Sequence, residues 1–401
     1  MKALPGRPRR ALIVVENLPL PFDRRVWQEA LALREAGYEV SIICPKGRDH
    51  TAPYELLEGI HIHRHPLPVE ADSAFGYGLE YGLSLFWEFV LCVRIAMTRG
   101  FDVIHACNPP DTIFVIGRFF KLFGKRFIFD HHDINPELYE AKFQRRDVWY
   151  RILCRLERWT FATADVSIAT NESYKRIATE RGGMDPDRVF VVRSGPDLRR
   201  IRHVPPRTEL RRGKRYLVGY VGVIGAQEGL DLLLESVSYM RDTLGRRDVQ
   251  FVIVGSGTQV AALQALSSRL GLDDCIEFTG RVSDHDLWEI LGTTDICVNP
   301  DRANEMNDKS TMNKILEYMA LGKPIVQFDL TEGRYSAGEA SLYARQNDVR
   351  DFAEKMCQLL DDEALRDRMS RIGRSRVEGE LAWHHQVPHL LSAYEAAFSR
   401  R

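Results

Sequence analysis

Short apolar runs alternate with helical patterns along most of the chain. The run at residues 11–15 is unbroken, a pattern typical of a strand buried on both faces of a sheet, and a second run covers residues 40–44. Residues 24–36 lie between them, repeat apolar side chains at helical spacing, and are followed by Gly37, a common helix terminator. Further strands are predicted at residues 102–105, 126–129, 166–169 and 189–192. This alternation predicts a parallel sheet covered by helices.

A break in the middle of the chain separates this series from a second one. Residues 193–215 contain adjacent prolines and many basic side chains, which is typical of an exposed linker. Strands are predicted beyond it at residues 216–221, 249–254, 275–278, 295–298 and 324–328. We therefore predict an α/β fold of two Rossmann-like, doubly wound domains that face each other across a cleft. Residues 1–205 form the first and 214–380 the second, and an amphipathic helix at about 384–398 can pack back on the first.

Composition and charge argue against several classes of protein. Basic and acidic residues number 55 and 56, so the chain lacks the basic excess usual in proteins that bind duplex nucleic acid. The 7 cysteines include no C-x-x-C pair, which argues against a zinc ribbon and for a reducing compartment. The apolar stretch at about residues 75–97 is interrupted by Glu80, Glu88 and Arg94, and so predicts a buried or surface-lying helix in place of a membrane span.

The segment from Thr311 to Asp329, TMNKILEYMALGKPIVQFD, is the most specific in the chain. Apolar side chains line one face of a predicted helix that ends at Gly322. Glu317 lies among them, and Lys314 precedes it by one turn. In a ligand site the carboxylate would bind a ribose diol and the ammonium group a phosphate. An ordinary solvated pair is the alternative.

Two glycine turns follow predicted strands in the second half. The turn from Gly222 to Gly229 precedes a helix, so its backbone can approach a diphosphate whose charge the helix N-terminus favours. A plain tight turn is the alternative. The second turn begins at Gly255 and has Glu277 further along, which superficially fits a dinucleotide fingerprint. Val260 stands where the third glycine of that fingerprint would be, so the fit is weak.

The run from Asn313 to Val326 resembles the donor-site helix of family 4 glycosyltransferases. The resemblance extends to residues 30–40, 218–231 and 251–257, and so covers nearly the whole chain. It implies the two-domain fold called GT-B, retention of anomeric configuration, and no need for a metal or other cofactor. The substrates implied are a nucleotide-sugar donor, with UDP-sugars favoured and GDP-mannose second, and the hydroxyl of a surface polysaccharide or lipid-linked precursor.

The resemblance also implies roles for single residues. Glu317 matches the second of two glutamates, separated by seven residues, that bracket the donor in that family, and corresponds to the ribose ligand. Lys309 replaces the first glutamate, and Glu228 stands where many relatives carry a phosphate-binding lysine. Lys314 or Lys309 is therefore expected to supply the cation. The predicted donor-binding residues are Gly222, Gly225, Ala226, Gln227, Gly255, Arg281, Val282, Lys309, Asn313 and Glu317.

Asp130, His131, His132 and Asp133 end a predicted strand in the first half. Consecutive side chains on a strand point in different directions, so a shared metal ion is disfavoured. In the resembling family a histidine at this strand end lies beside the anomeric region of the donor and is often followed by an acid. His132 and Asp133 fit that position, and a structural histidine is the alternative. The predicted catalytic residues are His132, Asp133 and Lys314.

The acceptor side is predicted from polar and basic residues of the first half. Arg24 and Arg25 lie near a helix N-terminus, where cations oppose the helix dipole and so indicate an anionic partner; a solvated pair is the alternative. Asn108 and Asp111 follow another predicted strand. Phenylalanine and basic side chains interleave over residues 118–126, and with the apolar 75–97 stretch they can rest on an anionic membrane surface. A core-packing helix is the alternative there.

The function that we predict is retaining, metal-independent transfer of a sugar from a nucleotide-sugar to an acceptor hydroxyl. The partners are the donor, a glycan or lipid-linked acceptor and a membrane surface, with no nucleic acid. We expect a cytoplasmic protein that can lie at the inner face of the membrane. Three alternatives stay open: a nucleotide-sugar epimerase or hydrolase on the same fold, a dinucleotide-dependent oxidoreductase that uses Gly255 and Glu277, and a catalytically silent binding protein.

Overall fold

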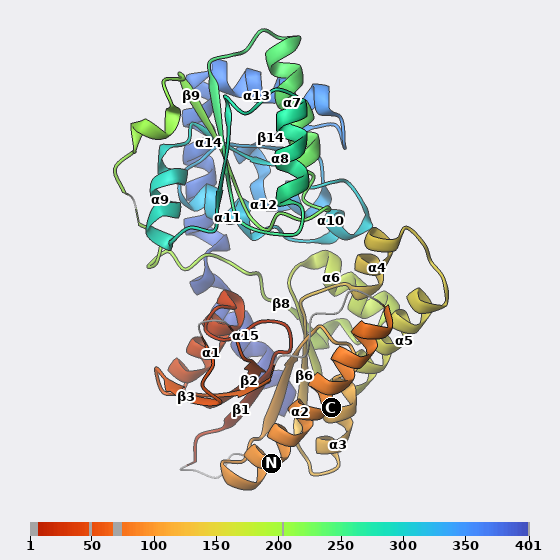
Figure 1. Cartoon of the computed structure of the whole chain (residues 1–401). Helices are drawn as coiled ribbons and strands as arrows, with labels where there is room; N and C mark the ends of the chain where they lie inside the picture. Colours follow the sequence, from red (N-terminus) through yellow and green to blue (C-terminus); the bar gives the residue numbers. More distant parts are fainter. Residues whose placement is uncertain (1–6, 48–49, 67–73, 203, 400–401) are drawn as a thin grey trace. The chain divides into compact units, whose positions relative to one another are not determined.

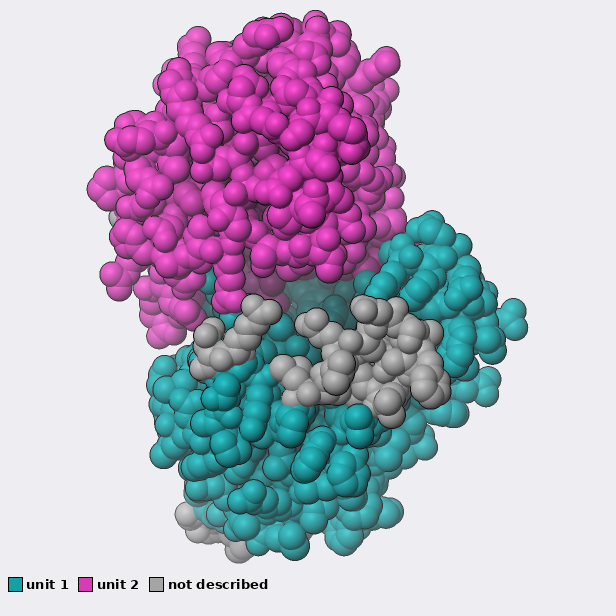
Figure 2. Space-filling model, in the orientation of Figure 1, with its two compact units in different colours: residues 1–193, 386–401 teal, residues 194–385 magenta. Residues whose placement is uncertain are grey.

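The computed structural model describes residues 7–47, 50–66, 74–202 and 204–399, which fold into two compact α/β units (Figure 1). Unit 1 comprises residues 1–193 and 386–401, and unit 2 comprises residues 194–385 (Figure 2). Each unit contains one mainly parallel sheet whose strands alternate with helices along the chain. The α/β class with two Rossmann-like sheets is therefore confirmed.

The sheet of unit 1 is parallel except at one edge. Its strands are β1 (Arg10–Val14), β2 (Glu39–Pro45), β3 (Tyr54–Leu57), β4 (Ile60–His65), β5 (Val103–Cys107), β6 (Arg126–His131), β7 (Val166–Ala169) and β8 (Val189–Val191). They are ordered β3-β4-β2-β1-β5-β6-β7-β8, and β3 pairs with β4 antiparallel. The helices of this unit are α1 (Arg24–Glu35), α2 (Ala74–Thr98), α3 (Phe114–Lys121), α4 (Asn135–Phe143), α5 (Val148–Thr163) and α6 (Glu172–Arg176).

The sheet of unit 2 is wholly parallel. Its strands are β9 (Tyr216–Val221), β10 (Val249–Val254), β11 (Ile276–Gly280), β12 (Ile296–Asn299), β13 (Ile325–Phe328) and β14 (Ser341–Ala344), in the order β11-β10-β9-β12-β13-β14. The helices are α7 (Leu230–Asp242), α8 (Val260–Arg269), α9 (Asp284–Thr293), α10 (Glu305–Lys309), α11 (Asn313–Ala320), α12 (Thr331–Ala337), α13 (Val349–Asp361) and α14 (Glu363–Arg376). Alternate residues of β9 belong to different apolar cores, Val218 to one and Leu217 to the other, because the sheet is buried on both faces.

The strand order creates a switch point in each sheet. In unit 1, β1 lies between β2 and β5, and in unit 2, β9 lies between β10 and β12. The connections that leave the two sides of such a central strand run in opposite directions, so the loops at its carboxyl end diverge and leave room for a ligand. Functional residues are therefore expected in the loops that follow β1, β5, β9 and β12.

The segment predicted as an exposed linker packs against unit 2. The carbonyl of Pro196 accepts a hydrogen bond from the N–H of Trp383 at 3.0 Å, and a Cβ at Gly195 would lie 2.1 Å from the Leu381 carbonyl oxygen. Ile201 packs against the same core as α11. The units consequently divide between residues 193 and 194, earlier than the boundary expected between 205 and 214. Basic composition alone could not reveal these backbone contacts.

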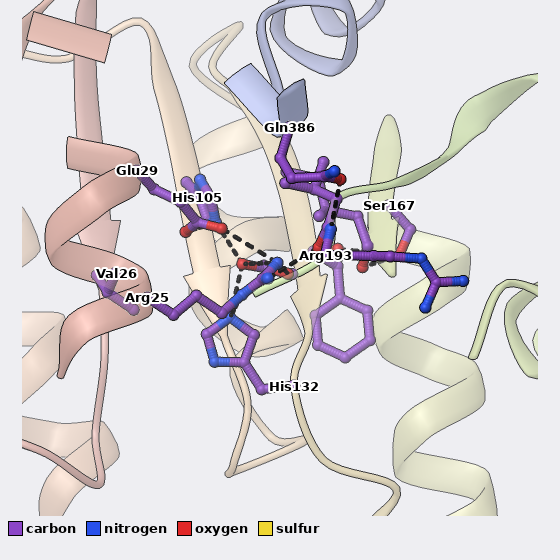
Figure 3. Close-up of polar contacts among 12 residues, drawn as sticks. Arg25, Val26, Glu29, His105, His132, Ser167, Arg193 and Gln386 are labelled. Carbon is purple, nitrogen blue, oxygen red and sulfur yellow. Dashed lines mark hydrogen bonds and ion pairs between the residues drawn. The ribbon is translucent and has the colours of Figure 1, made fainter. Parts of the chain in front are cut away.

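The last helix, α15 (Trp383–Phe398), belongs to unit 1 from Gln386 onward. Gln386 accepts a hydrogen bond from the N–H of Arg193 at 3.0 Å, a contact drawn in Figure 3. Further along, Leu390, Ala393 and Tyr394 are each 0% exposed. The chain thus returns from unit 2 to complete the core of unit 1.

We predict that Leu390→Ala loosens unit 1 without loosening unit 2. Truncation of a fully buried leucine costs about 2–5 kcal/mol. Hydrogen exchange read by mass spectrometry should become faster in β1 and β5 while β9 and β10 keep wild-type protection. The matched control is Leu359→Ala in α13, also 0% exposed, which should give the reverse pattern. Unchanged exchange in unit 1 of the Leu390→Ala protein would contradict the packing of α15.

Candidate functional site

The loops that follow β9 and β10 are joined backbone to backbone. The N–H of Gly222 donates to the Val254 carbonyl at 3.1 Å, and the N–H of Ile224 donates to the Ser256 carbonyl at 3.0 Å. A Cβ at Gly255, where φ is +144°, would lie 1.8 Å from the Gly222 carbonyl oxygen. Both the conformation and the space therefore require glycine at position 255. The two glycine turns of the sequence form one structure at the carboxyl ends of these strands.

The ammonium group of Lys314 lies against this turn. Its Nζ donates to Oδ1 of Asp301 at 3.0 Å and to the Tyr220 hydroxyl at 3.3 Å, and the Lys314 and Asp301 side chains are only 12% and 2% exposed. Its Cε would lie 3.5 Å from a Cβ at Gly222. Burial alone would lower the pKa of Lys314, but Asp301 and Tyr220 raise it above its ordinary value. The ammonium group is therefore held charged beside the turn.

Glu228 brings a second carboxylate to the same cluster. Its Oε2 would lie 2.7 Å from a Cβ at Gly225, while Ala226 is exposed on the turn. Burial raises the pKa of Glu228 above its ordinary value; Lys314 opposes the shift and Asp301 adds to it. The raised pKa favours the neutral acid, which reduces the repulsion that a phosphate would meet here.

The other predicted donor residues lie on neighbouring elements of the same edge. On α11, Asn313 is exposed and Glu317 is half-buried. After β11, Arg281 is exposed and Val282 is half-buried, and the last carbonyl of that strand accepts the N–H of Gly255 at 3.0 Å. The structure thus brings the predicted donor set together around the carboxyl ends of β9, β10, β11 and β12.

The short helix α10 ties the loop after β12 to the glycine turn. Asn307 donates to the carbonyl of Gln227 at 2.9 Å and to the carbonyl of Arg302 at 2.8 Å. Lys309 pairs with Glu305 across one turn of α10 at 2.5 Å. The cation at position 309 thus already has an acidic partner on its own helix.

In unit 1, Asn108 braces the backbone of the two predicted catalytic residues. Its Oδ1 accepts the N–H groups of His132 at 2.7 Å and Asp133 at 3.1 Å, and its Nδ2 donates to the Asp133 carbonyl at 2.6 Å. The same Nδ2 donates to Oδ1 of Asp111 at 2.9 Å, and Asn135 donates to Oδ2 of Asp111 at 2.7 Å. Asn108 and Asp111, predicted for the acceptor side, hold the loop that carries His132 and Asp133.

The Asp130 carboxylate is the centre of a buried polar network, of which Figure 3 labels the surrounding residues. Nε2 of His132 lies 2.6 Å and Nε2 of His105 lies 3.2 Å from Oδ2, and Nη2 of Arg25 lies 3.0 Å from Oδ1. Glu29, one turn after Arg25, lies 3.1 Å from the same guanidinium nitrogen. Burial alone would raise the pKa of Asp130, but Arg25 and the histidines hold it well below its ordinary range. Asp130 is therefore an anion.

The two arginines at the start of α1, Arg24 and Arg25, differ in their exposure to solvent. Asp23 caps this helix, its side chain accepting the N–H of Val26 at 3.2 Å. Arg24 is exposed at the helix start, whereas Arg25 is 8% exposed. The anionic partners of Arg25 are carboxylates of this chain, which corrects the inference that it indicates an external anion. Only Arg24 retains that interpretation.

The carboxylate network also contains groups that can ligate metals. The ligand atoms of Glu29, Asp130 and His132 lie within 4.8 Å of one another. The guanidinium of Arg25 already neutralises Asp130 at 3.0 Å, and its positive charge opposes a metal cation at the same carboxylate. The second such group shares Asp130 and meets the same objection; it comprises His105, Cys107 and Asp130. These residues fit an internal ion pair better than a metal site.

Several residues that organise both sites escaped sequence analysis. Glu29 has the i, i+4 spacing of a helical ion pair with Arg25, a signal that could have been noticed. Asp301 follows a strand end, as ligand-site acids often do. His105 and Tyr394 are separated by 289 positions, and no local pattern connects them.

Comparison with known proteins finds relatives of both units. Residues 23–200 match the family described as Glycosyltransferase Family 4, and residues 215–362 match the family described as Glycosyl transferases group 1. The chain is 24% identical over 358 residues to the 2-deoxystreptamine glucosyltransferase of Streptomyces kanamyceticus. That alignment covers 85% of this chain and 89% of the relative.

Solved structures share the two-unit fold. Sucrose-phosphate synthase from Thermosynechococcus elongatus aligns with a TM-score of 0.76 at 17% identity, over 98% of this chain and 99% of that one. HepE from Anabaena, solved in complex with UDP-glucose, aligns with a TM-score of 0.73 at 14% identity, over 96% of this chain and 99% of that one. At these identities the alignments show the fold of the chain.

The buried acid Asp111 predicts a pH-dependent stability. Burial raises its pKa to about 7, and Glu157 adds to the shift against Asn135, His131 and Asn108. Below that pH the folded state keeps a proton that the unfolded state has lost, so stability falls as pH rises from about 4 to about 7. Relative to Asp111→Asn, the wild type should lose about 1 kcal/mol per pH unit in that range.

Urea unfolding of both proteins at several pH values checks this expectation. The substitution is free to change the absolute stability, because an asparagine side chain at this position cannot accept from both neighbouring amides. The tested quantity is therefore the difference between the two proteins in the slope of stability with pH. Parallel stability curves between pH 5 and 7 would contradict a raised pKa at this position.

Proposed function

The chain belongs to the group 1 and family 4 glycosyltransferases, and we propose that it is a retaining, metal-independent enzyme that uses a nucleotide-sugar donor. The observation that carries the proposal is the cluster at the carboxyl end of β9, where the glycine turn contacts Lys314 and Glu317 follows one turn later. In doubly wound sheets this switch point is where ligands bind. The complex of the structurally similar HepE with UDP-glucose supports the same donor class.

We assign the donor diphosphate to the turn at residues 222–229 and to Lys314. Backbone N–H groups at the start of α7 favour negative charge, and Lys314 remains charged because Asp301 and Tyr220 hold it. As the bond to the sugar breaks, charge develops on the leaving diphosphate, and these groups stabilise it. Glu317 would accept the ribose hydroxyls, and Arg281 and Val282 would lie near the base.

The transfer itself requires little chemistry from side chains. The acceptor oxygen bonds to the anomeric carbon on the face from which the diphosphate leaves, and a phosphate oxygen takes the acceptor proton. The protein supplies positioning and charge stabilisation. His132 and Asp133 are assigned to the transferred sugar or the attacking hydroxyl, and Arg24 to an anionic acceptor. We favour UDP-sugars over GDP-mannose, and a surface polysaccharide or lipid-linked precursor as acceptor.

A surface of unit 1 supports contact with an anionic membrane. On α2, exposed apolar side chains recur on one helical face, at Leu83, Phe86, Val90 and Met97. Phe89 of α2 packs edge-on against Phe119 of α3 with ring centres 5.0 Å apart, so the two helices share this surface. Leu122 and Phe123 are 82% and 64% exposed at the end of α3. Basic side chains follow along the same segment, at Arg118, Lys121, Lys125 and Arg126.

Apolar side chains beside basic ones fit the boundary of an anionic leaflet. Within residues 7–47, 50–66, 74–202 and 204–399, no helix is long and apolar enough to cross a bilayer. We therefore propose that the protein is cytoplasmic and lies on the inner face of the membrane through this α2–α3 surface.

A thermal-shift screen tests the donor site. Purified protein is heated with UDP, GDP, ADP or NAD, with and without EDTA. One nucleoside diphosphate should raise Tm, because a ligand at 100 times its Kd adds about 2.7 kcal/mol to the folded state. EDTA should not change the shift, and Glu317→Ala should remove most of it. The matched control is Glu354→Ala, an exposed glutamate of α13, which should respond as the wild type does.

Other outcomes identify the alternatives. Stabilisation by NAD alone would indicate an oxidoreductase, stabilisation by no nucleotide a silent binding protein, and donor conversion without an acceptor an epimerase or hydrolase. Proton NMR of the transfer product reads its anomeric configuration. An inverted product would refute retention while leaving the donor site intact.

Flotation with vesicles tests the α2–α3 surface. We expect binding to vesicles that contain phosphatidylglycerol and little binding to phosphatidylcholine alone. Because an apolar side chain that becomes buried contributes about 1.5–3 kcal/mol, Leu122→Asp should weaken binding by about tenfold or more. The matched control is Val148→Asp on α5, also an exposed apolar residue of unit 1. Equal losses in both variants would argue against a specific surface.

A further inference from the structure

A chain of buried hydrogen bonds joins the last helix to His132. The Tyr394 hydroxyl of α15 lies 2.9 Å from Nδ1 of His105, and Nε2 of that ring lies 3.2 Å from Oδ2 of Asp130. Nε2 of His132 lies 2.6 Å from the same oxygen. Tyr394, His105 and Asp130 are each 0% exposed. The Asp130 carboxylate is therefore shared by two imidazole rings.

The buried hydrogen bonds from Tyr394 through His105 to Asp130 all donate in one direction, from the tyrosine hydroxyl toward the carboxylate. Burial raises the pKa of Tyr394 well above its ordinary value, so the hydroxyl keeps its proton and donates to Nδ1 of His105. Burial lowers the pKa of His105 although Asp130 opposes the shift, so this ring carries a single proton. With Nδ1 accepting from Tyr394, that proton is on Nε2 and points at Asp130.

The same reasoning fixes the proton on His132. A separation of 2.6 Å between Nε2 and an ionised carboxylate oxygen requires a proton between the two atoms. Nε of Arg25 also lies 3.0 Å from this nitrogen and would favour the opposite tautomer. In that tautomer the Nε2 lone pair of His132 would face the anionic Oδ2 of Asp130, which is the nearer of the two neighbours at 2.6 Å. The guanidinium keeps its acceptors at the other two nitrogens, since Nη2 donates to Asp130 at 3.0 Å and Nη1 to the Val192 carbonyl at 2.8 Å.

Arg25 and Glu29 determine the charge around the Asp130 carboxylate. Asp130 is already balanced by the guanidinium of Arg25 at 3.0 Å. Burial raises the pKa of Glu29 well above its ordinary value, with Arg25 opposing the shift and Asp130 adding to it.

We propose that Asp130 is a positioning residue that holds His132 in the Nε2–H tautomer, so that Nδ1 presents a lone pair to a hydroxyl group of the bound sugar or acceptor. Among the residues that the structure describes, His132 makes its side-chain hydrogen bonds through Nε2, and the side chain is 14% exposed. Asn108 holds the backbone of the same residue at 2.7 Å. The hydroxyl ligand rests on the proposed function, whereas the tautomer does not.

Tyr394 and His105 extend this positioning to the C-terminal helix. Without the Tyr394 hydroxyl, Nδ1 of His105 would lose its donor, and the proton of that ring could move from Nε2 to Nδ1. Asp130 would then face a lone pair of His105 and lose one of the donors that hold its orientation. A residue of α15 thereby acts on His132 through two intermediates.

Nitrogen NMR of the full chain with ¹⁵N-labelled histidine tests the tautomer directly. His132→Gln identifies the His132 signals by their loss. At neutral pH we expect Nδ1 of His132 at the shift of an unprotonated ring nitrogen and Nε2 at that of a protonated one. A protonated Nδ1 in the wild type would overturn the proposal. UDP-glucose should shift the Nδ1 signal; an unmoved signal in protein that binds UDP-glucose would overturn the assignment of the hydroxyl ligand.

Variants test the positioning roles. Asp130→Asn should release the tautomer and lower kcat by about a hundredfold. This variant removes the buried partner of Arg25 and can fail to fold, so Tyr394→Phe, which removes one oxygen, is the second test. It should give averaged His132 ring shifts and a several-fold lower kcat at unchanged KM.

The matched control is Tyr38→Phe. The Tyr38 ring packs edge-on against Tyr394 with ring centres 5.3 Å apart, and it takes no part in the hydrogen bonds that lead to His132. Wild-type ring shifts in Tyr394→Phe, or equal shifts in the two variants, would overturn the role of α15. Failure of the proposed function has a different signature. In that case no nucleotide would bind, whereas the His132 tautomer in the ligand-free protein would still be measured.

Discussion

The buried ion pair between Arg25 and Asp130 is the interaction on which the candidate site of unit 1 depends. It joins the first helix to β6 in the interior, and His105 of β5 contacts the same carboxylate. Removing one partner of a buried pair costs about 3–5 kcal/mol, because the other charge stays unpaired. The carboxylate that the fold needs for this pair also orients His132. Stability and site geometry in unit 1 therefore rest on the same atoms.

Unit 2 contains a comparable buried ion pair, in which the carboxylate of Asp301 holds the ammonium group of Lys314. Asp301, at the end of β12, holds Lys314 against the glycine turn after β9, so a buried carboxylate again fixes a functional side chain. Glu228 adds a second acid beside Lys314, and burial raises the pKa of this acid above its ordinary value. A phosphate at this turn would therefore be held by backbone N–H groups and by one lysine, Lys314.

The periodicity of apolar residues predicted the strands of both sheets because buried parallel strands are unbroken apolar runs. It did not predict β3 or β14, which are short and partly exposed edge strands. The linker prediction placed the domain boundary too late, since nothing in a basic, proline-containing segment shows that its backbone packs on a core. Strand ends followed by glycine or polar residues gave the candidate site residues, and the structure places the donor candidates at the carboxyl ends of neighbouring strands of unit 2.

The sequence by itself determined the fold class, the two-unit organisation and the strand ends that carry the candidate site residues, because these follow from local periodicity and from loops that end strands. Tertiary structure decided which side chains work together there. Tyr394 contacts His105, although the two residues are separated by 289 positions in the sequence. Asp130 contacts the ring of His132, and no local spacing in the sequence indicates which of the two neighbouring histidines lies beside it. Long-range packing brings such groups within hydrogen-bond distance, and only burial gives those hydrogen bonds the strength to fix a proton.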